Sequence, residues 1–333
     1  MASAVVAGTI ADIDCLSNYF GPSAFLTWHG TYTHTILAVV LILAAIPAIP
    51  LAAIFRGGLR TNVFVPKDKT ISNDTQAKQR SILGTIFVAP FLLPLCAALL
   101  HIGMDACQSD GVALFLLFSP KRFAADWLPS IDPWILTILI AAIALPELLR
   151  LVGSEIGAKT KKPRGQTGAI IGLALVLAYI GARATLHSNV LALMGSRTFH
   201  GETPRRAWAY PESLSLYTWH GVAETESALN EIDVNATSAS DFDPDSSLRL
   251  FKPESSPVLE AARNTIVARR FLATAQIPKA SVEKTEAGYI VILRDLRYVA
   301  TGDIKHEVAA YIELDPNSKV AAQELVWAKD LHK

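Results

Sequence analysis

Four long apolar runs in the first part of the chain predict membrane-spanning helices, because a helix needs about 20 apolar residues to cross a bilayer. The runs cover Thr35–Phe55, Ile82–Asp105, Pro133–Leu151 and Thr167–Leu186. Prolines interrupt the first two runs, which a membrane helix tolerates when its neighbours satisfy the freed carbonyls. In the fourth run, Gly168, Gly172 and Gly181 predict close contact with a neighbouring helix.

The pattern changes after residue 186, where polar residues and shorter alternating segments take over. Residues 256–275 have helical spacing, and four alternating segments predict strands at Ala280–Lys284, Tyr289–Tyr298, Glu307–Leu314 and Ala321–Ala328. The stretch Glu231–Ser256 is rich in Ser, Asp and Pro and predicts a mobile loop. We therefore expect a mainly α polytopic membrane domain over residues 1–186, followed by a soluble α+β domain over residues 187–333.

Charge adds an orientation to this picture. Basic residues gather in the loops 56–80 and 150–165, which predicts that both loops are cytoplasmic. Alternating spans then place the first 34 residues, the loop 106–132 and the C-terminal domain on the opposite, periplasmic or extracellular side. The net charge is zero and only 18% of residues are charged, so the composition gives no reason to expect a nucleic acid partner.

His101 and Asp105 close the second apolar run and carry the first candidate chemistry. They are one helical turn apart, so their side chains share a face of the predicted helix. Ionisable groups at the end of a membrane span are costly, and they mark a candidate functional site. Both side chains can reach one metal ion or one small cluster. The alternative is a hydrogen-bonded pair that locks two helices together.

Two further pairs precede the first apolar run. His29 and His34 would diverge by about 140° on a regular helix, so their convergence requires His29 in a loop and His34 in the first helical turn. Asp12 and Asp14 could bridge metals, hold a water or supply a general base. The alternatives are that the two histidines cap a membrane helix and that the two carboxylates lie at a solvent-exposed helix end. The predicted topology places all three pairs on one side, which favours a single metal site with zinc as the first candidate.

Two pairs of residues nearby have weaker functional readings. Cys15 and Cys107 each follow a candidate ligand pair and could act as minor ligands or form a disulfide, although ordinary buried cysteines are favoured. Lys121 and Arg122 could meet an anionic substrate or a lipid headgroup. The favoured alternative for each cation alone is snorkelling beside an interfacial belt of Phe123, Trp127 and Trp134.

Three segments resemble the YdjM-like group of predicted membrane-bound metal-dependent hydrolases, described as LexA-binding inner-membrane proteins. Ala11–Asp14, His29–Thr35 and His101–Asp105 are similar to the family segments Pro-Asp-x-Asp, His-Arg-Gly-x-Thr-His-Ser and His-x-x-x-Asp. The similarity continues through Phe118–Phe123, Asp126-Trp127 and Asp132-Pro133. Gly30-Thr31 stand where the family has Arg-Gly, so a guanidinium is missing from that position.

Together, the residues and the resemblance imply a divalent-metal-dependent hydrolase at the outer face of a bacterial inner membrane. The expected metal ligands are His29, His34, His101 and Asp105. Asp12 and Asp14 are the expected catalytic carboxylates or further ligands, and Lys121 and Arg122 the expected substrate contacts. The location favours a membrane lipid or another amphiphilic ester or phosphoester as substrate. The rival hypothesis is a non-catalytic membrane protein, either an ion-binding transporter or an assembly factor, that uses the same residues structurally.

Overall fold

A computed structural model describes residues 8–39, 89–119, 121–155, 165–238, 242–301 and 304–331, together with Val5, Leu41 and Ser240. The chain divides into two compact units, one of residues 1–106 and 110–124 and one of residues 107–109 and 125–333. This division differs from the expected boundary at residue 186, which falls inside a helix of the second unit. The third and fourth predicted spans therefore group with the C-terminal sheets, because the fourth helix continues into a sheet core.

The described part of the first unit contains short helical segments and an apolar helix. They are η1 (Ile10–Phe20), α2 (Pro22–Trp28), η2 (Tyr32–His34) and α5 (Ala89–Ala106). The remaining parts of the first two predicted spans, residues 40, 42–55 and 82–88, lie outside the described residues, as does the whole basic loop 56–80. A small apolar core of Val39, Ala98, Ile102 and Val112 joins α5 to the segments around it.

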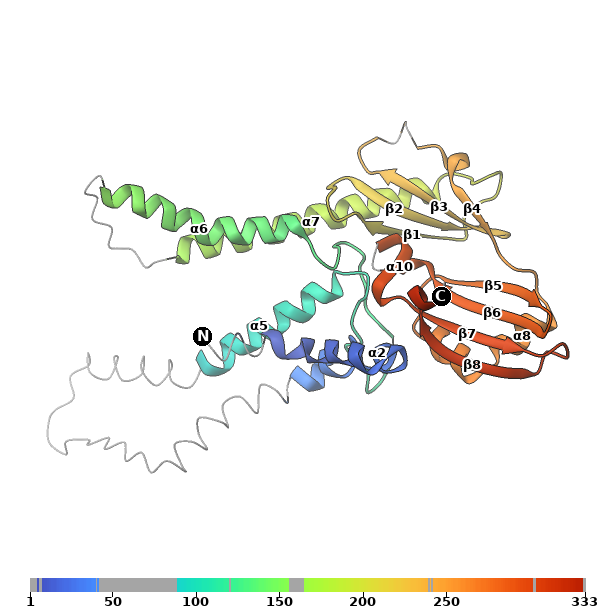
Figure 1. Cartoon of the computed structure of the whole chain (residues 1–333). Helices are drawn as coiled ribbons and strands as arrows, with labels where there is room; N and C mark the ends of the chain where they lie inside the picture. The colour runs from blue at the N-terminus through green and yellow to red at the C-terminus, as the bar shows by residue number, and fades with distance from the viewer. Residues whose placement is uncertain are drawn as a thin grey trace, which may run out of the picture. The chain divides into compact units, whose positions relative to one another are not determined.

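The helices α6 (Pro133–Glu155) and α7 (Gln166–Gly195) form a hairpin in the second unit (Figure 1). A Cβ atom added at Gly172 would lie 2.6 Å from Cβ of Ala142, and Gly168 packs against the same residue, so both glycines permit the predicted close approach. At Gly181 such an atom would meet nothing within 4 Å among the described residues, so a close helix contact there stays a prediction. Among the described helices, α7 is long and apolar enough to cross a membrane, and the apolar stretches of α5 and α6 are shorter. Four spans therefore stay a prediction.

α7 is longer than its predicted span, and its C-terminal end packs against the first sheet. The predicted span stops at Leu186, but the helix continues to Gly195. Val190 and Met194 on this extension are fully buried with Phe199 and Trp219 in the core of the first sheet. The extension forms because its apolar side chains are covered by strands rather than by lipid, which the local sequence pattern does not distinguish.

The first sheet contains β1 (Arg206–Pro211), β2 (Thr218–Glu224), β3 (Ala228–Asn235) and β4 (Leu248–Phe251), antiparallel and in chain order. The predicted mobile loop Glu231–Ser256 is corrected in part, because it contributes the end of β3, the turn η4 (Pro244–Ser246) and all of β4. Glu231 pairs with Leu248 across these strands, and Asn230 pairs with Arg249. Backbone hydrogen bonds between β3 and β4 hold this segment in strands, although its polar composition predicted a loop.

The second sheet contains β5 (Pro278–Thr285), β6 (Gly288–Asp295), β7 (Val308–Leu314) and β8 (Val320–Trp327), again antiparallel and in chain order. These strands match the four predicted segments closely. β6 ends earlier than predicted because the Asp295 carboxylate accepts hydrogen bonds from the backbone of Gln276, Ile277 and Arg297. The short helix α10 (Leu296–Thr301) begins there instead, followed by η5 (Ile304–His306) before β7 and η6 (Ala328–Asp330) after β8.

Two helices cover one face of the second sheet (Figure 1). The predicted helix over residues 256–275 is divided into α8 (Pro257–Arg263) and α9 (Ile266–Leu272). The division occurs at Thr265, whose hydroxyl accepts a hydrogen bond from Ala268 N and caps the second helix. Leu259 and Phe271 pack from these helices against β6 and β7. The C-terminal part is therefore a helix-covered antiparallel sheet.

Candidate metal centre

The segment η1 directs its two carboxylates to different neighbours. A 3-10 helix has three residues per turn, so side chains two positions apart point in different directions. Asp12 is half-exposed and lies with Oδ1 3.3 Å from Nε2 of His101. Asp14 is buried and faces the loop that follows α2, where it meets His29 and His34. The pattern Asp-x-Asp thus supplies two separate contacts rather than one paired carboxylate.

The loop after α2 brings His29 and His34 to different oxygens of Asp14. His29 directly follows α2, and Gly30 adopts a left-handed φ of 64°, which favours glycine. His34 ends the short turn η2. Nδ1 of His29 lies 3.5 Å from Oδ1 of Asp14, whereas Nδ1 of His34 lies 3.1 Å from Oδ2. His29 has the predicted loop position, but the two imidazoles do not meet at one point.

The first cluster consists of Asp12, His34, His101 and Asp105, with α5 supplying the last two. Oδ2 of Asp105 lies 3.2 Å from Nε2 of both histidines. Oδ1 of Asp12 lies 3.3 Å from His101 Nε2 and 4.0 Å from His34 Nε2. The i, i+4 pair on α5 therefore does share a face, as the spacing predicted.

These separations suit a single small cation. Four ligand atoms at 2.0–2.1 Å from a tetrahedral Zn²⁺ are separated from one another by about 3.3 Å, the edge of the tetrahedron. Three of the four distances between a histidine nitrogen and a carboxylate oxygen in the first cluster have nearly this length, and the fourth, between His34 and Asp12, is 4.0 Å. Two imidazole nitrogens and two carboxylate oxygens are also donors that zinc accepts.

The second cluster consists of Asp14, Cys15 and His29. Their ligand atoms all lie within 4.8 Å of one another, as do those of Asp12, His34 and His101 in the first cluster. The ring of His29 stacks on Phe25 with a centroid distance of 4.7 Å and an interplanar angle of 15°, which holds its orientation. The described residues therefore contain two neighbouring groups of candidate metal ligands, joined through Asp14 and His34.

Buried polar atoms without hydrogen-bond partners mark both clusters. Oδ2 of Asp105 and Nε2 of His101 are in this state in the first cluster, and Oδ1 of Asp14 and Nδ1 of His29 are in the second. A buried polar atom left unsatisfied is costly, so its neighbours or a ligand normally satisfy it. A divalent cation is a physical match for these carboxylate and imidazole atoms, and the donor set of each cluster fits one.

Asp14 is held by several donors through one oxygen. Its Oδ2 accepts hydrogen bonds from Gly30 N at 2.8 Å and from the Thr33 hydroxyl at 2.9 Å. His34 approaches the same oxygen with Nδ1, which leaves Nε2 of its ring for the first cluster. A carboxylate on the distal nitrogen of a metal-ligating histidine fixes the ring and its tautomer. Asp14 therefore has the geometry of an orienting residue for His34.

Without a cation, the clusters act as paired charges. Burial opposes charge on His34, but the neighbouring carboxylates of Asp105 and Asp14 outweigh it and raise the pKa of His34 to about 9. Burial likewise opposes charge on His29, but the nearby Asp14 carboxylate and Cys15 side chain outweigh it and raise the pKa of His29 to about 10. Burial favours the protonated form of Asp14, yet the two histidines hold the pKa of its carboxyl well below its usual range. A metal at these atoms must displace histidine protons.

Arg122 and Lys121 have different surroundings from those expected of a substrate-binding pair. The Arg122 guanidinium donates hydrogen bonds to the backbone carbonyls of His29 and Asp110. It also lies beside Gly30, where an added Cβ atom would be 3.1 Å from Nη2 of Arg122. A guanidinium is thus present next to this loop, although it comes from a distant part of the chain. Lys121 is exposed, so its expected contact with an anionic group stays a prediction.

Cys15 and Thr33 have contacts in the site that the sequence pattern does not predict. Cys15 was favoured as a buried cysteine, but it is exposed and free and stands beside His29. Cys107, the other candidate, is also free. The Thr33 hydroxyl binds Asp14, whereas the Thr35 hydroxyl accepts a hydrogen bond from Ala38 N at the start of the following helix. The adjacency of Cys15 to Asp14 was the available signal for the second cluster.

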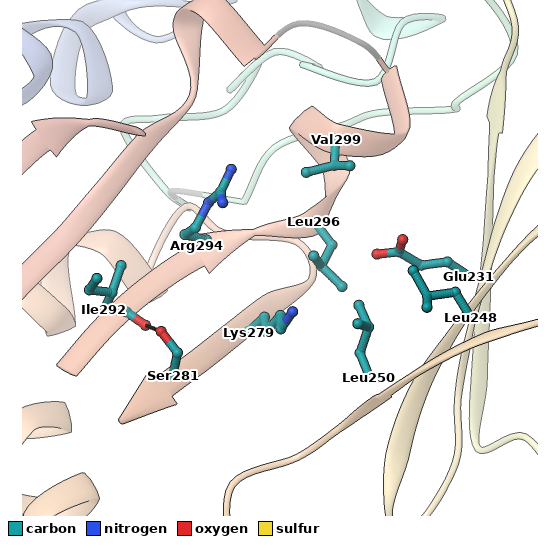
Figure 2. Close-up of a pocket in the computed structure, with 9 residues that line it drawn as sticks. All are labelled: Glu231, Leu248, Leu250, Lys279, Ser281, Ile292, Arg294, Leu296 and Val299. Atoms are coloured by element: carbon teal, nitrogen blue, oxygen red, sulfur yellow. Dashed lines mark hydrogen bonds between the residues drawn. The ribbon is translucent and has the colours of Figure 1, made fainter. Parts of the chain in front are cut away.

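A separate pocket of about 290 Å³ lies in the second unit, between the two sheets (Figure 2). Its apolar wall is formed by Leu248, Leu250, Ile292, Leu296 and Val299, and its polar residues are Glu231, Lys279, Ser281 and Arg294. Arg294 forms two hydrogen bonds with the fully buried carboxylate of Glu307, so its charge is already balanced. The His/Asp clusters belong to the first unit and do not line this pocket.

Comparison with known families matches two separate parts of the chain. The family model of the YdjM inner membrane protein matches residues 1–190, more than half of the chain and all of the residues of both clusters. The model of the YfhP C-terminal alpha/beta plait domain matches residues 257–333, which contain the helix-covered second sheet. No curated protein and no solved structure matches the chain.

Proposed function

The chain belongs to the YdjM family of inner membrane proteins, and on that basis we propose that it is a membrane-bound metal-dependent hydrolase. Its substrate is an amphiphilic ester or phosphoester, of which a membrane lipid is the first candidate. In this proposal four helices span the membrane, and the basic loops 56–80 and 150–165 face the cytoplasm. The clusters and the C-terminal domain then lie on the periplasmic or extracellular side.

The observation that carries the proposal is the convergence of donor atoms in the first cluster. Oδ2 of Asp105 lies 3.2 Å from Nε2 of both His34 and His101, although the two histidines come from η2 and α5. Two of these atoms, Nε2 of His101 and Oδ2 of Asp105, are buried without hydrogen-bond partners. Unsatisfied donor atoms brought together at the end of an apolar helix favour a bound cation over a hydrogen-bonded pair that only joins two helices.

A divalent metal in the first cluster would supply Lewis acidity toward a carbonyl or phosphoryl oxygen. His34, His101 and Asp105 hold the cation in this proposal, and Asp14 keeps the ring of His34 in the required orientation. The Asp12 side chain is 55% exposed, so it can also contact solvent and accept a proton from an attacking water. Lys121 is available at the surface to attract an anionic headgroup.

The rival function is non-catalytic, and one observation favours it. The raised pKa values of His29 and His34, about 10 and about 9, are those of histidines paired with carboxylates in a structural charge network. A transporter or assembly factor could use such a network to join η1, η2 and α5. Metal content distinguishes the two functions, because a charge network needs no cation.

The test is metal content by plasma mass spectrometry on detergent-purified full-length protein, with zinc or manganese supplied. His101→Ala and Asp105→Ala remove ligands of the first cluster. His220→Ala is the matched control, because His220 pairs with Asp233 at 2.9 Å in the first sheet and belongs to neither cluster. We expect near-stoichiometric metal in the wild type and in the control variant, and a loss of about one equivalent in each folded ligand variant.

Hydrolysis is tested on the same samples with chromogenic carboxylic esters and phosphodiesters and with phospholipid vesicles. Metal-dependent turnover that His101→Ala abolishes supports the proposal. Wild-type protein that stays metal-free after metal is supplied contradicts it and favours the structural charge network. Metal-loaded protein without turnover on any of these substrates contradicts the assigned substrate class.

A further inference from the structure

The second cluster has features that the proposed function does not use. Asp14 divides its two oxygens between different neighbours, so Oδ2 is occupied by Gly30 N, the Thr33 hydroxyl and His34. Oδ1 is buried and has no hydrogen-bond partner, and its nearest charged neighbour is Nδ1 of His29 at 3.5 Å. The Asp14 side chain is only 1% exposed, so water does not provide an easy substitute.

His29 presents an equally unsatisfied atom to the same point. Its Nδ1 is buried without a hydrogen-bond partner. Stacking on Phe25 fixes the plane of the ring, and the Arg122 guanidinium holds the backbone carbonyl of the same residue. The imidazole is therefore preorganised from both sides, and its orientation does not depend on the first cluster.

Cys15 completes this group with a thiol. It follows Asp14 directly, and its Sγ lies within 4.8 Å of the ligand atoms of Asp14 and His29. Because Cys15 is exposed, water or a substrate group can take the remaining coordination position on that side. A set of thiolate, imidazole and carboxylate is suited to zinc, cobalt or iron(II), whereas Mg²⁺ and Ca²⁺ prefer oxygen ligands alone.

We infer that Asp14, Cys15 and His29 form a second binding position for a thiophilic divalent cation, separate from the first cluster. The inference goes beyond the proposed function, because it neither requires hydrolysis nor uses His101 or Asp105. Asp14 connects the two positions, since one oxygen orients His34 and the other ligates the second cation. The bound metal would satisfy both buried atoms that the protein alone leaves without hydrogen-bond partners.

Cobalt provides a direct probe, because a thiolate ligand gives Co²⁺ a charge-transfer absorption that imidazole and carboxylate ligands do not. Full-length protein in detergent is stripped with a chelator and titrated with Co²⁺. We expect two equivalents and a thiolate band in the wild type. Cys15→Ser loses the band and one equivalent, and because Cys15 is exposed this substitution leaves the fold intact. Cys107→Ser is the matched control and keeps both.

Three results separate this inference from the proposed function. One equivalent with a thiolate band, lost in Cys15→Ser and kept in His101→Ala, supports the second position and contradicts metal in the first cluster. One equivalent without a thiolate band, lost in His101→Ala, overturns the second position and leaves the first intact. Two equivalents that persist in Cys15→Ser also overturn the second position, because Cys15 is then not a ligand.

Discussion

Nδ1 of His34 lies 3.1 Å from Oδ2 of Asp14, while Nε2 of the same ring lies 3.2 Å from Oδ2 of Asp105. One imidazole thus joins a buried carboxylate on η1 to a carboxylate at the end of α5. This arrangement gives Asp14 a role different from that of Asp12, although only one residue separates the two in the sequence.

The first prediction concerns the orientation of His34. Asp14→Asn keeps an acceptor for Gly30 N but removes the negative charge that fixes the His34 tautomer. We expect Co²⁺ affinity at the first cluster to fall about 10- to 100-fold. The titration is done in the Cys15→Ser background, so that only the first cluster is measured. Thr33→Val, which removes one hydrogen bond to Asp14, is the milder control. Equal Co²⁺ affinity in Asp14→Asn and in its Cys15→Ser parent would show that Asp14 does not orient His34.

The second prediction separates a structural role of Arg122 from substrate binding. Arg122→Ala leaves the carbonyls of His29 and Asp110 without their charged donor. We expect a loss of about 1.5–3 kcal/mol in unfolding free energy. Arg122→Lys restores little of it, since an ammonium lacks the planar fork of donors. Thermal unfolding in detergent measures this effect, with Lys121→Ala as an exposed control that changes stability by less than about 0.5 kcal/mol. A raised KM with unchanged stability in Arg122→Ala would instead indicate a substrate contact.

The third prediction concerns the buried arginine of α7. Arg183 is 1% exposed and donates hydrogen bonds to the carbonyls of Ser215 and Leu216 at 3.1 and 2.7 Å. Its guanidinium also lies 4.3 Å from the ring centroid of Trp219. Arg183→Met should cost about 1.5–3 kcal/mol, because partly buried carbonyls lose a charged donor.

Near-ultraviolet circular dichroism and thermal unfolding test this loss, because Trp219 reports the packing of the first sheet. Arg263→Met, at the exposed end of α8, is the control for removal of a positive charge. Wild-type stability in Arg183→Met would mean that α7 is anchored to the first sheet by its apolar residues alone.

The fourth prediction is a pH dependence in the first sheet. Hydrogen bonds from the side chain and backbone of Ser227, together with Thr225 and the charge of Arg249, lower the pKa of Glu202 to about 2. A carboxyl with a lowered pKa in the folded state stabilises the fold above its ordinary pKa of 4.5 and loses that contribution as the pH falls toward 2. Glu202→Gln should therefore flatten the decline of stability between pH 4.5 and pH 2 relative to the wild type. Denaturant unfolding at several pH values gives this difference, and parallel curves would contradict the assigned role of Glu202.

The sequence predicted the parts of the fold that depend on local periodicity. β5 to β8 alternate strongly enough to be located within a few residues, and the apolar runs at α6 and α7 locate both helices. The first sheet was missed as a sheet, because β4 has four residues and forms only through pairing with β3. The extension of α7 to Gly195 was also missed, since a helix side chain covered by lipid and one covered by a sheet are equally apolar.

For the candidate site, residue order alone predicts which residues are available and that His101 and Asp105 share one helical face. That relation depends only on the four-residue spacing within α5. The tertiary structure decided that His29 and His34 meet different oxygens of Asp14, that Cys15 joins His29, and that Arg122 binds the loop backbone. These contacts join segments that are distant in the chain. Their geometry follows from the left-handed turn at Gly30 and the 3-10 winding of η1. Both features depend on the packing of the first unit and not on residue order alone.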